Sequence, residues 1–270
     1  MALEILLSRA DAACHDPRMD RHLVFQRLHK FRDLGGYAAG GGLAVRWGRL
    51  YRSDSLGKLR DDDWDRFLAL GVRTVVDLRY PWEIEWRGRI PQHPSFAYLN
   101  LSVEHRPYDQ ARLGPEVAVG PYLAERYLEV AQDGVVELRR ALEVIADDDS
   151  GPLVFHCASG KDRTGLLAAL VLALLGVDDD TIVADFELTE LARDGLVAEW
   201  LASDPGRELA WPPHFGRAPG EAMRLFLDGV RSRYGSLTGY AAGRLGVDDA
   251  LLGALRRNLL EPAPAAVTGG

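Results

Sequence analysis

Ten consecutive residues, His156-Cys-Ala-Ser-Gly-Lys-Asp-Arg-Thr-Gly165, hold a nucleophile, an acid and two cations. An apolar segment typical of a buried strand ends at His156, and a second, typical of a buried helix, begins near Thr164. Backbone N–H groups of the turn between them and the positive end of the helix attract anions. The same field stabilises a thiolate, so the segment predicts a phosphate cradle with Cys157 as a nucleophile at its base.

Arg163 stands at the edge of this turn and adds a second requirement for phosphate chemistry. Its planar guanidinium can donate to two phosphoryl oxygens and meet the charge that develops on them. Taken alone, Cys157 could be a small buried hydrophobic residue at a strand end. Cysteine, glycine, arginine and threonine together, between a buried strand and a buried helix, favour the catalytic interpretation.

Lysine occurs only at positions 30, 58 and 161, although lysine and arginine together number 32. Because arginine is otherwise the cation of this chain, Lys161 at the edge of the turn indicates a place where a compact charge is needed. The alternative for Lys161 is a lysine solvated at the surface.

The elements around the turn alternate between strands and helices. Strands are predicted at residues 74–77, 96–101 and 151–156, with two short strands around the glycines at 40–42, the second near 43–51. Helices are predicted at residues 58–70, 122–146 with a possible break at Gly134, 164–175, 178–202, 219–233, 236–245 and 248–260, with a proline-rich loop at 203–219. The order predicts one α/β domain over residues 1–261, with a mainly parallel central sheet flanked by helices, and a flexible tail at 262–270.

Several strings of the sequence resemble one family. A Cys-x5-Arg segment after a strand resembles the signature of the cysteine-based protein tyrosine phosphatases, and Gly160-Lys-Asp-Arg-Thr-Gly165 resembles their bacterial and fungal branch. The resemblance spans most of the chain and implies a tyrosine phosphatase-like fold with activity on phosphotyrosine and often on phosphoinositides. Lys30 and Ser159 depart from it, since asparagine and alanine are usual there. The flanking strings that match are Phe31-Arg-Asp-Leu-Gly-Gly-Tyr37, Leu50-Tyr-Arg-Ser53, Val76-Asp-Leu-Arg79 and Tyr234-Gly-Ser-Leu-Thr-Gly-Tyr240.

The resemblance also suggests which group protonates the leaving oxygen. Many tyrosine phosphatases use a Trp-Pro-Asp loop, which this chain lacks, and the resemblance places the acid at Asp162 inside the turn. Asp77, at the carboxyl end of a buried strand, is the second candidate. The alternative for Asp77 is a structural carboxylate that caps the next turn or pairs with Arg79. Thr164 can donate its hydroxyl to the departing sulfur, a role compatible with capping the helix. The residues expected to bind phosphate are Ala158, Ser159, Gly160, Lys161, Asp162 and Arg163.

Three further features follow from the resemblance or from spacing. The adjacent pair Lys161 and Asp162 accompanies activity on phosphoinositides in the resembling family. The helical stretch after Asp185 and the proline-rich loop to Pro219, residues near 195–215 among them, resemble a helical lid. Such a lid would exclude water and oxidants from the thiolate. Tyr122 and Tyr127 are only roughly aligned on one helix face, so core packing is favoured over a clamp for a phosphoaryl group.

Three functions compete. The first is a phosphomonoesterase that forms a cysteinyl-phosphate and acts on a phosphotyrosine protein, a phosphoinositide or a small phosphorylated metabolite. The second is a rhodanese-like sulfurtransferase, but such loops generally resemble Cys-x4-Arg, which is narrower than a tetrahedral phosphate needs. The third is a non-catalytic phosphate-binding module, against which the presence of Cys157, Asp162 and Arg163 argues.

Composition sets the broad limits. The 270 residues are 47% hydrophobic and 27% charged, as in globular proteins, and the net charge of −8 disfavours nucleic acid and anionic membranes as partners. Cys14 and Cys157 make no disulfide framework, and no signal peptide or stable membrane insertion is expected, so the cytoplasm is predicted, with secretion lacking a recognisable signal peptide left open. His15, His22 and His29 lie seven residues apart, too far for one ion, so no metal or other cofactor is expected.

Overall fold

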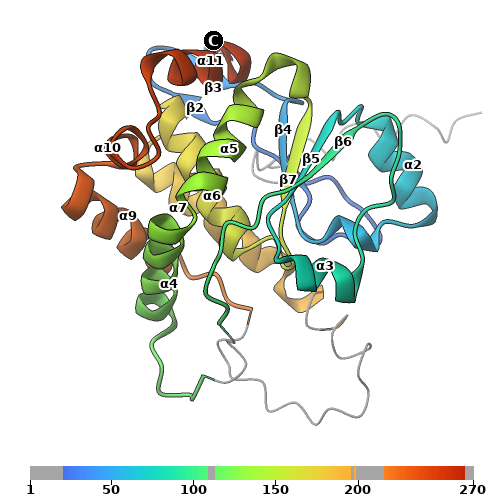
Figure 1. Cartoon of the computed structure of the whole chain (residues 1–270), viewed down its shortest axis with the longest axis horizontal. Coiled ribbons are helices and arrows are strands. Elements are labelled where there is room, and N and C mark those ends of the chain that lie inside the picture. The colour runs from blue at the N-terminus through green and yellow to red at the C-terminus, as the bar shows by residue number, and fades with distance from the viewer. Residues whose placement is uncertain (1–20, 109–112, 196–197, 199–215, 265–270) are drawn as a thin grey trace, which may run out of the picture.

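The computed structural model describes residues 21–108, 113–195, 198 and 216–264, in which short strands come first, strands and helices then mix, and helices predominate from residue 162 onward (Figure 1). The strands are β1 (Arg32–Asp33), β2 (Ala38–Ala39), β3 (Leu43–Val45), β4 (Leu50–Ser53), β5 (Thr74–Asp77), β6 (Ala97–Asn100), β7 (Leu153–His156) and β8 (Leu260–Pro262). The helices are α2 (Asp61–Ala69), α3 (Pro81–Arg87), α4 (Val119–Asp133), α5 (Val135–Ala146), α6 (Asp162–Leu175), α7 (Asp179–Glu187), α9 (Gly220–Tyr234), α10 (Leu237–Gly243) and α11 (Asp249–Leu259). Short 3-10 helices are η1 (Leu56–Lys58), η3 (Asp148–Ser150) and η4 (Leu188–Ala192).

The central sheet has five strands in the order β1-β4-β7-β5-β6. All neighbours pair in parallel except β1, which runs antiparallel to β4 at one edge. The register places Ser53 and Asp77 on either side of His156, so three strands reach the same edge together. The mainly parallel α/β fold predicted from the sequence is confirmed, and its carboxyl edge is where ligands bind in open sheets of this kind.

Alternating side chains divide the core between the two faces of the sheet. Val76 and Phe155 contribute to the larger cluster, beneath α4 to α7 and α9 to α11. Val75 and Val154 face the smaller cluster, which includes Phe67 of α2. In Figure 1 these two sets of helices lie on opposite sides of the sheet. The helix α6 is buried nearly all round, as its apolar sequence predicts.

Several boundaries differ from the sequence predictions. The predicted strand at 43–51 is two strands in different sheets, because the chain turns at Gly48, whose φ is +71°, so that β3 pairs with β8 and β4 with β7. Pro262 and Ala263 belong to the fold and not to the predicted tail, since Pro262 lies in β8 and the N–H of Ala263 donates to the carbonyl of Gly42. The helix α6 begins at Asp162, two residues before the predicted start, and α3 was not predicted at all.

The helix break predicted at Gly134 is confirmed between α4 and α5. A β-carbon at this position would lie 2.1 Å from the carbonyl oxygen of Val103, so only glycine fits against that backbone. Predicted elements within residues 199–215 lie outside the described part of the chain. Among the described residues, no helix is both long and apolar enough to cross a membrane.

Candidate active site

The loop from Cys157 to Lys161 joins the end of β7 to the first turn of α6, at the carboxyl edge of the sheet. Cys157 is only 1% exposed and belongs to the larger core cluster. Ala158 and Ser159 are half-buried, and Asp162 and Arg163 follow in the first helical turn. The structure therefore brings all of the residues expected to bind phosphate into one short loop and the helix start behind it.

Gly160 fixes the shape of the loop. Its φ is +65°, and a β-carbon would lie 2.7 Å from both the nitrogen of Asp54 and the carbonyl oxygen of Ser53. The carbonyl of Gly160 also accepts a hydrogen bond of 3.0 Å from Nη2 of Arg52. A larger residue would push the loop away from the segment that follows β4.

The start of α6 points its first N–H groups toward the loop. The N-cap residue is Lys161, whose side chain makes no capping hydrogen bond. Thr164 is buried, and its hydroxyl has no hydrogen-bond partner among the described residues. Thr164 therefore does not cap the helix, and its hydroxyl is available for another acceptor.

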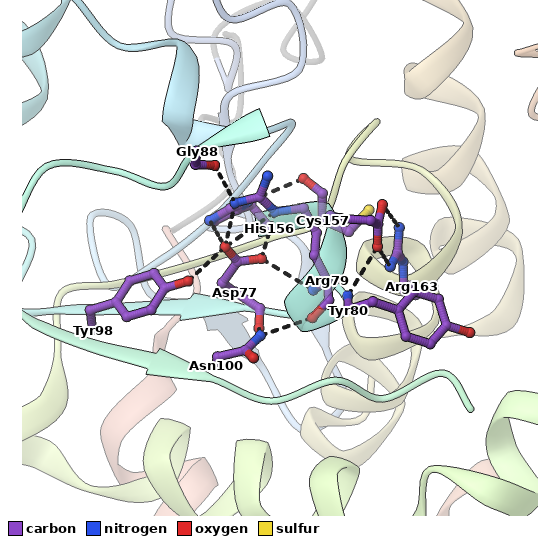
Figure 2. A network of polar contacts seen from close by, with 10 residues as sticks. Asp77, Arg79, Tyr80, Gly88, Tyr98, Asn100, His156, Cys157 and Arg163 are labelled. Carbon is purple, nitrogen blue, oxygen red and sulfur yellow. Dashed lines mark hydrogen bonds and ion pairs between the residues drawn. The ribbon is translucent and has the colours of Figure 1, made fainter. Parts of the chain in front are cut away.

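Arg163 lies between two carboxylates, and we call Arg163, Glu83 and Glu104 the outer cluster. Glu83, on α3, accepts from Nη1 and Nη2 of Arg163 at 2.5 and 3.0 Å. Oε2 of Glu104, beyond β6, lies 3.6 Å from Nε of Arg163. The ring of Tyr80 lies beside the guanidinium, 5.6 Å from centroid to Cζ, as Figure 2 shows. The guanidinium is thus oriented before any substrate arrives.

The two carboxyls of the outer cluster differ in their titration. Burial raises the pKa of Glu83, but the hydrogen bonds and charge of Arg163 outweigh this, and its pKa lies below the usual value. Burial raises the pKa of Glu104 to about 7, because Arg163 offsets burial only in part and the charges of Asp162 and Glu83 add to it. Sequence reasoning missed both residues.

Asp162 is held by two neighbours. The hydroxyl of Tyr127 donates to its Oδ1 at 2.7 Å, and Nζ of Lys161 lies 3.4 Å from the same oxygen. The ring of Tyr127 also packs against Phe186 and Phe226 in the core, as expected. Lys161 is only 2% exposed, so the solvated alternative for this lysine is wrong.

Asp77 belongs to the buried polar network drawn in Figure 2. Its carboxylate accepts from Nε and Nη2 of Arg79 at 2.9 and 2.6 Å, and from the hydroxyl of Tyr98 at 2.9 Å, while Nε2 of His156 lies 3.6 Å away. Burial raises the pKa of Asp77, but His156 and Arg79 outweigh it and bring the pKa to about 2. These contacts favour the structural alternative for Asp77, because they stabilise its ionised form.

A second group of charges lies behind the loop, and we call Arg32, Arg52 and Asp185 the inner cluster. Asp185 accepts from Nε of Arg32 at 3.0 Å, from Nη1 of Arg52 at 2.5 Å and from the hydroxyl of Tyr37 at 2.9 Å. Because Arg52 also donates to Gly160, the cluster ties the loop to β1, β4 and α7. The signal for it lay in the two N-terminal strings, which contain both arginines and Tyr37.

The three lysines of the chain surround the loop on the Asp54 side. The N–H of Lys30 donates to Oδ1 of Asp54 at 3.1 Å, and Nζ of Lys58 donates to Oδ2 at 3.1 Å. Asp54 in turn lies against Gly160, next to Lys161. Burial and the charge of Lys161 lower the pKa of Lys30 to about 7. The rare lysines thus share one location, which the sequence could not show.

Residues at the two ends of the segment expected to form a lid contact each other and the loop. Glu190 of η4 accepts from Nε of Arg217 at 3.0 Å and from the N–H of Ala218 at 2.5 Å, and Nζ of Lys161 donates to the carbonyl of Arg217 at 3.0 Å. Residues 196–197 and 199–215, with most of the expected lid, lie outside the described residues.

No group of three or more histidine, cysteine, aspartate or glutamate side chains in the described part of the chain is arranged to hold a metal ion. Cys14 and His15 lie outside that part.

The sequence of this chain is similar to those of known phosphatases. The family model described as "Tyrosine phosphatase family" matches residues 23–261. A Cupriavidus necator protein provisionally named a tyrosine-protein phosphatase, H16_A0669, is 37% identical over 175 residues, which are 62% of this chain and 62% of that protein. The triple specificity protein phosphatase PtpB of Mycobacterium tuberculosis is 30% identical over 184 residues, 58% of this chain and 64% of PtpB. The chain thus spans under two thirds of the length of these two relatives.

Among solved structures, the crystal structure of TpbA from P. aeruginosa aligns with 64% of this chain and 91% of its own, at 19% identity and a TM-score of 0.30.

Proposed function

This chain belongs to the tyrosine phosphatase family, and we propose that it hydrolyses phosphate monoesters through a cysteinyl-phosphate intermediate on Cys157. The observation that carries the proposal is the loop between β7 and α6, with Cys157 at its base, Arg163 at its edge and the N-terminus of α6 behind it. A phosphoryl group bound there lies directly above the sulfur. The reacting atoms are then positioned without any further rearrangement of the backbone.

In the first step, the Cys157 thiolate attacks phosphorus, a sulfur–phosphorus bond forms, and the bond to the leaving oxygen breaks. Arg163 and the helix N–H groups meet the charge on the non-bridging oxygens. Asp162 donates its proton to the leaving oxygen, so the product departs as a neutral alcohol or phenol. Tyr127 and Lys161 hold the Asp162 carboxyl at the loop for this transfer.

In the second step, water attacks the phosphorus of the cysteinyl-phosphate. The Asp162 carboxylate takes the proton of that water, and the sulfur leaves as a thiolate. The Thr164 hydroxyl can donate a hydrogen bond to the departing sulfur, a role supported by its burial without another partner among the described residues. This step restores the thiolate for the next turnover.

We propose phosphotyrosine proteins as the first substrate class. Beyond Arg163, an aromatic strip leads from the site to the surface: Tyr80 stacks on Trp82 with ring centroids 5.6 Å apart, and Trp82 and Trp86 are 53% and 73% exposed on α3. Such a strip can contact residues that flank a phosphotyrosine, which a small metabolite lacks. Phosphoinositides are a second class, supported by Lys161 beside Asp162. A small phosphorylated metabolite is the alternative.

We also propose that the chain after Asp185 closes over the loop as a lid. Support comes from Arg217, which Glu190 holds in place while its carbonyl accepts from Lys161. A lid at this position would keep water and peroxide from the thiolate.

The experiment that tests the proposal compares wild type with Cys157→Ser. Phosphate release should be measured from a phosphotyrosine peptide, a phosphoserine peptide, phosphoinositides and sugar phosphates, in the presence and absence of EDTA. We expect wild-type turnover to be insensitive to EDTA, and Cys157→Ser to retain oxyanion binding with under about 1% of the rate, because the serine hydroxyl does not ionise there. Residual activity well above this level would exclude the covalent route, and sulfur transfer from thiosulfate by wild type would favour the rhodanese alternative.

A further inference from the structure

Glu104 is a buried carboxyl that the proposed reaction steps do not use. It lies four residues beyond the end of β6 and is 6% exposed, with Oε2 3.6 Å from Nε of Arg163. It lines a narrow pocket with Asp162, Tyr108 and Tyr127. The Arg163 guanidinium beside Glu104 is also the group that we expect to bind an oxyanion in the loop.

Glu104 and Glu83 hold Arg163 in different ways. Glu83 accepts two hydrogen bonds from Arg163 and a third from the N–H of Tyr80, so it is the firm anchor of the guanidinium. Glu104 makes only the longer 3.6 Å approach to Nε. The pKa of Glu104, about 7, allows it to gain or lose a proton near neutral pH, whereas Glu83 stays ionised.

The groups that face Glu104 come from four parts of the chain. The charged and titratable neighbours are Asp162 and Arg163 of α6, Glu83 and Tyr80 at α3, His105, Arg106 and Tyr108 of the segment beyond β6, and Arg126, Tyr127, Glu129 and Asp133 of α4. Four of the charged ones are engaged elsewhere: Arg106 pairs with Asp133, and Arg126 pairs with Glu129. Burial raises the pKa values of the tyrosines well above the neutral range.

An arriving oxyanion changes the balance of charge at this point. The outer cluster holds one cation and two carboxyls, so with both carboxyls ionised it is already negative before a dianion binds. Like charges this close repel strongly when water is excluded. Protonation of Glu104 removes one of them and leaves the Glu83 anchor intact.

We propose that oxyanion binding in this loop is coupled to protonation of Glu104: the neutral carboxyl leaves Nε of Arg163 to the phosphoryl oxygens, and the ionised carboxylate competes with them. The proposal rests on the proposed phosphate-binding role of the loop. It makes Glu104 a positioning residue, which acts through Arg163 rather than on the reacting atoms.

Sulfate binding to the full chain tests the coupling, because sulfate remains a monomeric dianion between pH 6.5 and 8.5. Calorimetry in two buffers with different heats of ionisation gives both Kd and the number of protons taken up. The Cys157→Ser background removes the thiol as a source of protons. We expect binding to be about tenfold weaker at pH 8 than at pH 6.5, with close to one proton taken up at pH 8. In Glu104→Gln, the Kd should be nearly constant and the proton uptake should vanish.

Matched variants separate this outcome from others. Glu129→Gln, which alters a carboxyl of the neighbouring pocket, should behave as the background protein does. Lys30 has a pKa of about 7 on the other side of the loop, so uptake that persists in Glu104→Gln and disappears in Lys30→Met would overturn the proposal. A protein that binds no oxyanion at all would instead overturn the proposed function itself.

Discussion

The inner and outer clusters lie on either side of the same loop and carry opposite balances of charge. The inner cluster has two guanidinium groups for one carboxylate, and the outer cluster has one guanidinium for two carboxyls. The three inner side chains are at most 2% exposed, whereas Arg163 and Glu83 are each 11% exposed. The excess positive charge of the inner cluster adjoins Gly160, where it favours the binding of an anion. The excess negative charge of the outer cluster repels that anion, so it must be reduced when the anion binds.

The two clusters also differ in whether a substrate can replace their contacts. Asp185 accepts from three donors, and burial, which alone would raise its pKa, is outweighed by Arg32 and Arg52, so the pKa lies far below its usual range. No substrate can replace those contacts, so the inner cluster fixes the shape of the loop. In the outer cluster, Arg163 has a firm partner and a weak one, and a phosphoryl group can take the place of the weak one.

The largest effect is expected from Asp162→Asn, which removes the proposed acid between the clusters. Turnover of alkyl phosphates should fall about 10³-fold, because their leaving oxygens need a proton, whereas p-nitrophenyl phosphate should lose less than about tenfold. The measurement is kcat/KM for both substrates. Equal losses would mean that Asp162 only shapes the loop. If Asp77→Asn instead showed this dependence on the leaving group, Asp77 would be the general acid.

The next largest effect is expected on stability, from Asp185→Asn in the inner cluster. Loss of the carboxylate leaves two buried guanidinium groups without a counter-charge, which should lower the free energy of unfolding by about 3–5 kcal/mol. Asp180→Asn is the control, since that carboxylate is 84% exposed and pairs with Arg224, and its loss should cost less than about 1 kcal/mol. Urea unfolding of both variants measures the difference. Similar costs would contradict the rigid role of the inner cluster.

A smaller effect of opposite sign is expected from Glu104→Gln. The folded pKa of about 7 exceeds the usual value near 4.3, so the neutral form stabilises the fold below pH 4.3 and this contribution is lost as pH rises through 7. The variant avoids that loss and should be more stable than wild type at pH 8 by about 1–2 kcal/mol, but not at pH 4.5. Thermal or urea unfolding at both pH values gives the answer. A variant less stable at pH 8 would mean that Glu104 is a simple ion-pair partner.

The smallest effect is expected at the end of the aromatic strip. Replacing Trp82 and Trp86 together by alanine should lower kcat/KM for a phosphotyrosine peptide a few-fold, about 1 kcal/mol, and leave p-nitrophenyl phosphate unchanged. Val136→Ala is the control, since Val136 is also well exposed but lies on α5. Equal kcat/KM values for the peptide in wild type and in the double variant would mean that this surface takes no part in substrate recognition.

The elements that could be predicted from the sequence are those with a strong local pattern. The strand at Thr74–Asp77 is rich in β-branched residues, and α6 is apolar all round, so each was placed within two residues of its observed bounds. The loop between β7 and α6 was predicted because its chemistry lies in consecutive residues. Helix α3 was missed because seven residues are too few for a hydrophobic period, although Pro81 and Glu83 stand where a helix start favours them.

What the sequence determined by itself is the chemistry of the loop: a cysteine, an acid and an arginine at fixed separations between a strand and a helix are close in space in any fold that forms both. What only the tertiary structure decided is the charge around that loop. Glu83, Glu104 and Asp185 stand 80, 59 and 22 residues from Arg163 along the chain, and only the packed sheet brings the first two to it and sets the third behind the loop. The energies of such contacts depend on burial and distance, which sequence spacing does not contain.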